Sequence, residues 1–271
     1  MPPQQGMNMA PYQQRQRKIL PGSFEAYDGG VLGEMLEYVE GLYIYKVPDW
    51  KGAIIGIESQ QVFGVYDVKN RMQPMFHAKE KSGCCQRAFL KGSCHSYQMN
   101  VYSLANGAHS LWLEREYTCT MYCLNRPRLK VNIMDPNGQI LYLGAIEHTF
   151  TCCAYNFKIE DETGRQLYSI ETPACQKNLL CNCPCQGCQQ IDFSVMDASG
   201  TVISRAEKQG LDLISNAMTN AAQFCVMFTD QMPWSHRALL MCAMLFINYE
   251  MFEKEEGNER DRNDRSEVVV L

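Results

Sequence analysis

Residues 238–247 read ALLMCAMLFI, ten apolar side chains in succession near the C-terminal end of the chain. The surrounding segment 233–252, PWSHRALLMCAMLFINYEMF, has the composition of a helix, and Arg237 and Glu250 bracket its apolar run. A helix that spans a bilayer needs about 20 apolar residues, whereas a run of about 10 to 14 is more typical of a buried helix. Length therefore favours a helix enclosed by protein, with a single-pass membrane anchor as the alternative.

The predicted helix at 233–252 is apolar on every side, so none of its faces suits water. A helix of this kind must be enclosed by protein or by lipid. We expect it to pass through the interior of the domain that precedes it. The side chains expected in this interior include Leu239, Leu240, Met244, Leu245 and Ile247.

Three segments before the helix share one pattern: LKVNIMDPNGQILYL (129–143), YNFKIEDETGRQLYSI (155–170) and IDFSVMDASGTVISRA (191–206). In each segment apolar residues alternate up to an aspartate, a glycine follows three residues later, and a second stretch returns. Alternation with a period of two indicates a strand, and an acidic residue with a glycine at the reversal indicates a hairpin turn. A looser pair of segments, 63–80 and 99–116, repeats the pattern.

These five predicted hairpins indicate a mainly β domain, and the whole stretch from about Leu32 to Phe228 has β character. An antiparallel sheet of this size leaves exposed edges unless it closes on itself. We therefore expect a closed or nearly closed antiparallel barrel, with the apolar helix inside it.

Composition and charge restrict the function. The chain has 271 residues and a formal net charge of -5, which does not suit a surface that neutralises the phosphates of a nucleic acid. Nucleic acid is therefore not an expected partner. The sequence contains no nucleophile elbow, no phosphate-binding glycine loop and no paired-carboxylate motif, so we do not expect an enzyme that performs covalent chemistry.

Fourteen cysteines are concentrated between the predicted hairpins, at adjacent or closely spaced positions near the rims of the barrel. The N-terminal segment lacks the apolar core of a signal peptide, which predicts a reducing compartment where disulfides are rare. The densest cluster is CNCPCQGC at 181–188. Its thiols can stay free, bind zinc or carry acyl chains. Zinc is disfavoured, because only Cys185 and Cys188 have C-x-x-C spacing.

The predicted barrel, its cysteine clusters and its C-terminal helix resemble the phospholipid scramblase family. Residues 36–38, LEY, are similar to a segment at the start of the family's domain, and 83–85, GCC, to a double cysteine after its first hairpin. The cluster at 181–188 followed by 191–193, IDF, is similar to the family's cysteine cluster and the strand after it. The resemblance covers about 36–253 and implies a tubby-like fold, a closed barrel of about twelve antiparallel strands around a central hydrophobic helix.

The resemblance also implies a function. Family members are credited with moving phospholipids between membrane leaflets when calcium rises, and palmitoylated cysteines tether them to the membrane. This implies a place at the cytoplasmic face of the plasma membrane, peripheral through acylation or as a single-pass anchor. The family's acylation cluster corresponds to 118–123, TCTMYC. The candidate palmitoylation sites are Cys119 and Cys123, followed by Cys181, Cys183, Cys185 and Cys188.

The family's calcium segment corresponds to 219–228, TNAAQFCVMF, and here the sequence departs from the family pattern, because both leading carboxylates are absent. A calcium ion takes about six to eight oxygen ligands, with negative charge from Asp or Glu. The oxygen donors that remain nearby, Asn220, Gln223 and Asp230, are a poor set for this ion. Calcium therefore stays a candidate cofactor without a complete set of ligands.

Three regions are expected: a disordered Pro- and Gln-rich leader at 1–31, the barrel domain with its helix at 32–253, and a solvated charged tail at 254–271. The tail ends in Val269, Val270 and Leu271. A free carboxylate after such apolar residues is a ligand that a PDZ-type groove binds as an added strand. A protein partner at the tail is therefore expected besides membrane phospholipids.

Two functions remain open at this point. The resemblance favours a scramblase that moves phospholipids in both directions across the bilayer. The alternative is a non-catalytic lipid-binding or scaffolding module, tethered to the membrane and, through its tail, to a partner. A closed barrel filled by a helix offers a polar headgroup no wet path, which favours the alternative on physical grounds.

Overall fold

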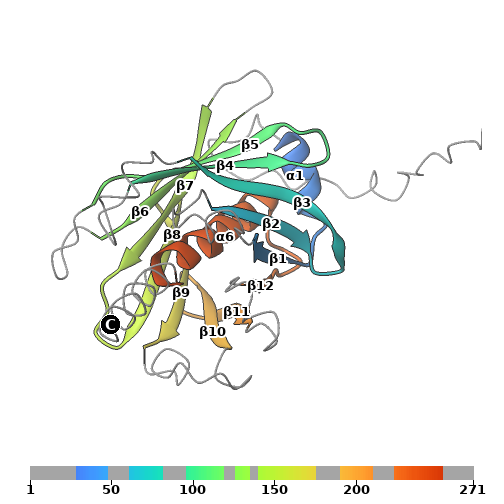
Figure 1. Ribbon diagram of the computed structural model, residues 1–271. Helices are drawn as coiled ribbons and strands as arrows, with labels where there is room; N and C mark the ends of the chain where they lie inside the picture. The colour runs from blue at the N-terminus through green and yellow to red at the C-terminus, as the bar shows by residue number, and fades with distance from the viewer. Residues whose placement is uncertain are drawn as a thin grey trace, which may run out of the picture.

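The computed structural model describes residues 29–47, 61–81, 96–118, 126–134, 140–174, 190–209 and 223–252. Within these ranges twelve strands form one closed barrel, each antiparallel to its neighbours, around a C-terminal helix (Figure 1). The helices are α1 (Gly30–Glu37), α6 (Trp234–Ile247) and the π-helix η4 (Asn248–Phe252). The strands are β1 (Gly41–Lys46), β2 (Val62–Asp67), β3 (Asn70–Lys81), β4 (Tyr97–Ser103), β5 (His109–Arg115), β6 (Arg128–Met134), β7 (Ile140–Thr149), β8 (Ala154–Asp161), β9 (Gln166–Pro173), β10 (Ile191–Asp197), β11 (Val202–Gln209) and β12 (Gln223–Met227).

All five predicted hairpins are present, as β2–β3, β4–β5, β6–β7, β8–β9 and β10–β11. In the β8–β9 turn, the side chain of Asp161 accepts hydrogen bonds from the backbone N–H groups two and four residues later, and Asp197 does the same in the β10–β11 turn. Gly164 and Gly200 follow with φ of 81° and 83°, a backbone conformation that glycine adopts without steric cost. The shared Asp-x-x-Gly pattern thus sets the reversal of both hairpins.

The prediction of β-structure, which begins at about Leu32, is wrong for residues 32–37, because these belong to helix α1. Leu32 and Leu36, four positions apart, are both buried, as expected for one face of a helix. This face packs against α6. Two buried leucines in one short segment were not enough to distinguish a helix from a strand by pattern alone.

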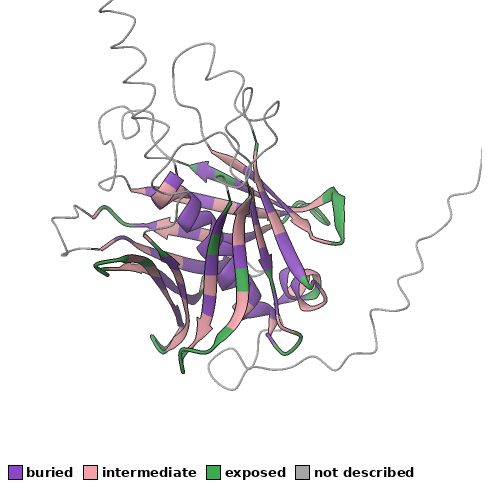
Figure 2. Cartoon of the chain, turned by 90° about the horizontal axis from the view of Figure 1, so that it is seen from below, coloured by how far each residue is buried: buried purple, intermediate pink, exposed green. Residues whose placement is uncertain are grey.

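The predicted enclosure of the apolar helix is confirmed. Every residue from Arg237 to Ile247 is buried, and the five side chains expected in the interior are at most 1% exposed. Figure 2 shows the buried residues along α6 and along the strands that surround it. Inward-facing residues alternate along the strands, as Met99 and Val101 do in β4. In the described part of the chain, no helix combines the length and apolar character needed to cross a membrane.

Gly144 in β7 marks a place where strand and helix approach closely. A Cβ atom at this position would lie 2.2 Å from the carbonyl oxygen of Glu160 and 3.2 Å from the side chain of Leu239. The pairing of β6 with β7 shifts register next to this glycine, between Val131 and Asn132. The missing side chain therefore lets β7 and β8 pair while α6 packs against them.

The two ends of the barrel differ. We call the end with the five hairpin turns the turn end; α6 follows β12 from there. We call the opposite end, where β1 connects to β2 and β7 to β8, the connection end. Of the fourteen cysteines, Cys225 lies in β12 and Cys242 in α6, and the other twelve belong to sequence segments whose flanking strands meet at the connection end. The described ones, Cys152 and Cys153, are exposed there, as predicted for a barrel rim.

His236, in the first turn of α6, lies under β9 near the turn end. Its Nδ1 atom is 2.7 Å from the hydroxyl oxygen of Tyr168. Burial lowers the pKa of His236 to about 4, and the charge of Arg165 acts in the same direction. The carboxylates of Asp161 and Glu162 act to raise this pKa but do not outweigh burial. Burial also raises the pKa of Tyr168 to about 12. Both groups are therefore neutral at physiological pH.

We expect the fold to lose stability as the pH falls from about 6.5 towards 4, because the unfolded chain protonates His236 near its ordinary pKa while the folded protein resists this. At pH 4.5 the loss from this residue is about 2 to 3 kcal/mol relative to neutral pH. Urea unfolding at both pH values measures it. His236→Gln does not titrate and should lose correspondingly less stability, and an equal loss in both proteins would contradict the assignment.

Candidate functional site

Arg237 joins α6 to α1 at the turn end. Its Nη1 atom donates to the carbonyl oxygens of Leu36, Glu37 and Val39 at 2.8, 2.6 and 3.0 Å. These carbonyls lie at the C-terminal end of α1, where unpaired carbonyl groups carry partial negative charge. Burial lowers the pKa of Arg237, and the carboxylates of Glu37 and Asp230 act against this. The positive charge before the apolar run is thus bound by backbone carbonyl groups through its Nη1 atom, while its buried Nε has no hydrogen-bond partner among the described residues.

Glu250 holds the other end of the helical segment at the connection end. Its Oε1 atom lies 2.7 Å from Nε of Arg115 in β5, and both side chains are only 1% exposed. The rings of Tyr97 and Tyr249 pack against each other at a tilt of 31°, with centroids 4.1 Å apart, and the Tyr249 hydroxyl donates to Glu80 at 3.4 Å. The C-terminal end of the helical segment is therefore tied to three strands, β3, β4 and β5.

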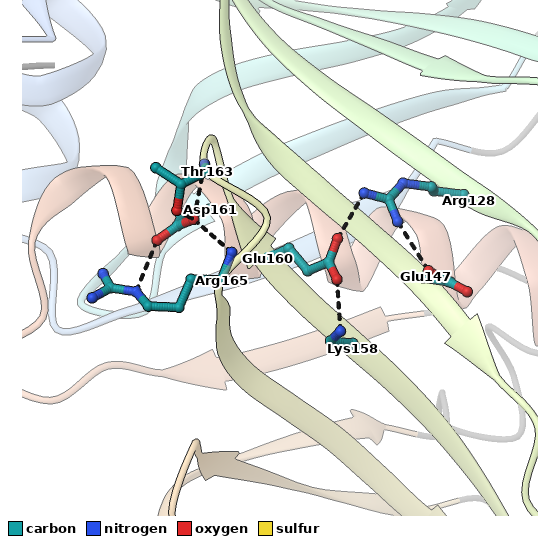
Figure 3. A network of polar contacts seen from close by, with 7 residues as sticks. All are labelled: Arg128, Glu147, Lys158, Glu160, Asp161, Thr163 and Arg165. Carbon is teal, nitrogen blue, oxygen red and sulfur yellow. Dashed lines mark hydrogen bonds and ion pairs between the residues drawn. The ribbon is translucent and has the colours of Figure 1, made fainter. Parts of the chain in front are cut away.

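A network of charged side chains links β6, β7 and β8 (Figure 3). Arg128 reaches Glu147 at 3.0 Å and Glu160 at 2.6 Å, and Lys158 lies 2.7 Å from the second oxygen of Glu160. Burial alone would raise the pKa of Glu160, but hydrogen bonds from Lys158 and Arg128 outweigh it and lower this pKa. Glu160 is thus charged and paired, and the network holds neighbouring strands together.

The β7–β8 hairpin presents a different surface at the connection end. Its tip, which we define as residues 150–155, reads FTCCAY and carries no charged side chain. Phe150 is 59% exposed and Tyr155 is 37% exposed, and both tip cysteines are exposed thiols. The backbone N–H of Ala174, just after β9, donates to the carbonyl oxygen of Cys153 at 2.9 Å. The tip is therefore apolar, exposed and attached to the neighbouring strand.

The structure describes few of the predicted site residues. The palmitoylation candidates Cys119, Cys123, Cys181, Cys183, Cys185 and Cys188 lie outside the described residues, as do Asn220 and the tail residues Val269, Val270 and Leu271. Gln223 begins β12 and Asp230 follows its opposite end, so the structure does not bring these two calcium candidates together. Within the described ranges, no group of three or more His, Cys, Asp or Glu side chains is arranged to hold a metal.

Comparison with known proteins identifies the family to which this chain belongs. A family model described as Scramblase matches residues 28–254, which span the barrel and its helix. The chain belongs to the scramblase family. The resemblance found in the sequence is thus confirmed for the family.

Several curated scramblases are similar to the chain. Phospholipid scramblase 2 of Bos taurus is 25% identical over 226 residues, which cover 83% of this chain and 72% of that protein. Phospholipid scramblase 1 of Mus musculus is 23% identical, with 85% and 66% covered. Phospholipid scramblase 1 of Homo sapiens is 22% identical, with 84% and 67% covered. No solved structure matches the chain.

Two features of this scramblase-family chain escaped the sequence reasoning. The buried Arg115 continues the inward-facing alternation of Leu111 and Leu113. The sequence pattern therefore indicates that Arg115 faces the barrel interior, but it does not indicate the partner of this residue. The exposed aromatic residues Phe150 and Tyr155 flank a cysteine pair that had been considered only for its thiols. Aromatic residues on both sides of an uncharged turn were the signal available for this tip.

We expect the Arg115–Glu250 pair to behave as a buried ion pair in a double-mutant cycle. Arg115→Met or Glu250→Leu alone should each destabilise the protein by about 3 to 5 kcal/mol, because the remaining charge stays buried without its partner. The double variant should cost much less than the sum. Urea unfolding provides the measurement. Lys69→Met, which breaks the exposed Lys69–Glu40 pair, is the control and should have little effect on stability, because water screens an exposed pair. Additive effects of the two single changes would contradict the pairing.

Proposed function

We propose that this chain moves phospholipids between the two leaflets of a membrane, without covalent chemistry, at the cytoplasmic face of the plasma membrane. The observation that carries the proposal is the match to the Scramblase family model over residues 28–254. The similar curated proteins bear the name phospholipid scramblase. The match spans about two thirds to three quarters of those proteins, 66% and 72% in two of them, so their activity is extended to this chain as a proposal.

The filled interior of the barrel restricts how such movement occurs. Because α6 occupies the interior with buried apolar side chains, the lumen offers no wet path for a polar headgroup. We therefore propose that the barrel acts on the bilayer from outside, without passing lipid through its centre. The two leaflets would exchange lipid where the barrel disturbs their packing.

Peripheral attachment is the second part of the proposal. Palmitoyl chains on Cys119 and Cys123, or on cysteines within 181–188, would anchor the chain, since stable attachment takes two membrane signals. These positions belong to segments whose flanking strands meet at the connection end. Acylation there would hold the connection end towards the membrane.

A second candidate function is a lipid-binding or scaffolding module that does not scramble. The buried helix in the barrel supports it, because a closed and filled barrel can bind a membrane surface without transporting anything. In this case the tail residues 269–271 would bind a PDZ-type partner. The two functions share the membrane attachment and differ in lipid movement.

Reconstitution separates the two candidates. Purified protein in vesicles that contain a fluorescent phospholipid should expose the inner-leaflet label to an impermeant reductant faster than protein-free vesicles do. Calcium and a chelator should give rates within about twofold of each other, because the segment at 219–228 lacks the carboxylates that this ion takes. Vesicle binding with an unchanged transbilayer rate would contradict scrambling and support the scaffold, which then predicts that deleting 269–271 reduces capture of a PDZ domain.

A further inference from the structure

Aromatic rings connect the barrel core to the tip of the β7–β8 hairpin. Phe246 of α6 meets Phe157 edge-on with ring centroids 6.0 Å apart, and Phe157 stacks on His148 at 4.6 Å. His148 in turn lies 6.1 Å from Tyr155. Exposure rises along this series from 0% at Phe246 and Phe157 to 37% at Tyr155, and the neighbouring Phe150 is 59% exposed. The exposed aromatic residues of the tip therefore stand on a packed base.

The composition of the tip is typical of a surface that becomes buried away from water when it binds a partner. Six consecutive residues without charge expose two aromatic rings and two thiols, and a free cysteine behaves as a small apolar side chain. Its shape is set by the strands, because Thr149 and Asn156 are paired and the Thr149 hydroxyl donates to the Asn156 carbonyl at 3.2 Å. Tyrosine and other amphipathic aromatic residues favour the boundary between lipid and water.

Arg126 lies at the base of the tip. Its Nε atom donates to the carbonyl oxygen of His148 at 3.1 Å, and its Nη2 atom is 2.9 Å from Nε2 of the same histidine. In the described part of the chain it has no carboxylate partner, whereas Arg128 and Lys158 in the adjacent network are paired with glutamates. A guanidinium in this position complements a phosphate of an anionic lipid.

The turn end, as far as its residues are described, presents a different surface. Its exposed large apolar side chains include Ile140 and Val202, both at 50% exposure, and one aromatic residue, Tyr142, at 37%. The β8–β9 and β10–β11 turns at this end carry Asp161 and Asp197. Burial acts to raise the pKa of Asp161, but hydrogen bonds from Thr163 and Arg165 outweigh it and lower this pKa, and a hydrogen bond from Ser199 lowers the pKa of Asp197. Both turns therefore carry a charged carboxylate, whereas the tip at 150–155 carries no charged side chain.

We propose that the β7–β8 tip, residues 150–155, is the part of the barrel that inserts into the interface of an anionic phospholipid bilayer, with Arg126 against the lipid phosphates. This rests on the proposed membrane function and specifies the surface that carries it out. Phe150 and Tyr155 enter the boundary between headgroups and acyl chains. The partner is a lipid surface because an uncharged aromatic tip with a cation at its base matches the polarity gradient of that boundary.

Two matched tryptophan variants test the insertion in the full chain, purified from a eukaryotic host. Phe150→Trp places the probe after the end of β7, and Ile140→Trp places it at the start of the same strand, at the opposite end of the barrel. Both sites are exposed, so both variants should fold like the parent. On phosphatidylcholine vesicles containing phosphatidylserine, brominated acyl chains should quench the tryptophan of Phe150→Trp beyond the quenching of the three native tryptophans. They should leave the tryptophan of Ile140→Trp unaffected.

Binding affinities provide a second readout. Changing Phe150 and Tyr155 together to Ser should weaken vesicle binding roughly tenfold, while Ile140→Ser changes it by less than about twofold. Arg126→Gln should cost about fivefold on anionic vesicles and nothing on neutral ones.

The outcomes separate the inference from the function on which it rests. Quenching confined to Ile140→Trp, or vesicle binding without quenching of either probe, would overturn insertion by the tip and leave membrane association standing. Failure of the parent chain to bind vesicles would overturn both. Insertion of the tip without lipid scrambling would support this inference while contradicting the proposed transport.

Discussion

The burial of α6 is the interaction on which the rest of the structure depends. A helix with apolar side chains on every face gains stability only where all of its surface leaves water. A barrel of twelve strands is wide enough to need filling, because its interior is broader than strand side chains alone can occupy. Helix and barrel therefore require one another: the strands enclose the helix, and the helix replaces what would be an empty interior.

The two charges that bracket the apolar run fix the helical segment along the barrel. Arg237 binds the backbone carbonyls at the end of α1, and Glu250 binds Arg115 in β5. Arg237 is bound at the turn end and Glu250 at the connection end, so the helical segment is held at both ends of the barrel. The aromatic rings that follow Phe246, first Phe157 and then His148, extend this fixed core to the exposed tip at 150–155. The packing of the helix and the surface offered to lipid therefore belong to one continuous arrangement.

Much of the fold was predictable because its determinants are local. The Asp-x-x-Gly turns specify the hairpins, and the unbroken apolar run specifies an enclosed helix. The partner of Arg115 was not predictable, since Glu250 lies 135 residues away and only the closed barrel brings the two together. Helix α1 was missed because Leu32 and Leu36 give too short a pattern. The tip was not predictable from alternation alone, because Phe150 and Tyr155 continue the pattern of His148 and Phe157 past the end of the barrel, where they are exposed.

The environment of α6 on the membrane tests the central claim most directly. Vesicle-bound protein can be cross-linked with phospholipids that carry a photoactivatable group in the acyl chain, and the labelled residues mapped by mass spectrometry. An intact barrel predicts no label on residues 238–247, because protein encloses them on every side. Labels distributed along that helix would show that it faces lipid, and would contradict a barrel that keeps its helix inside.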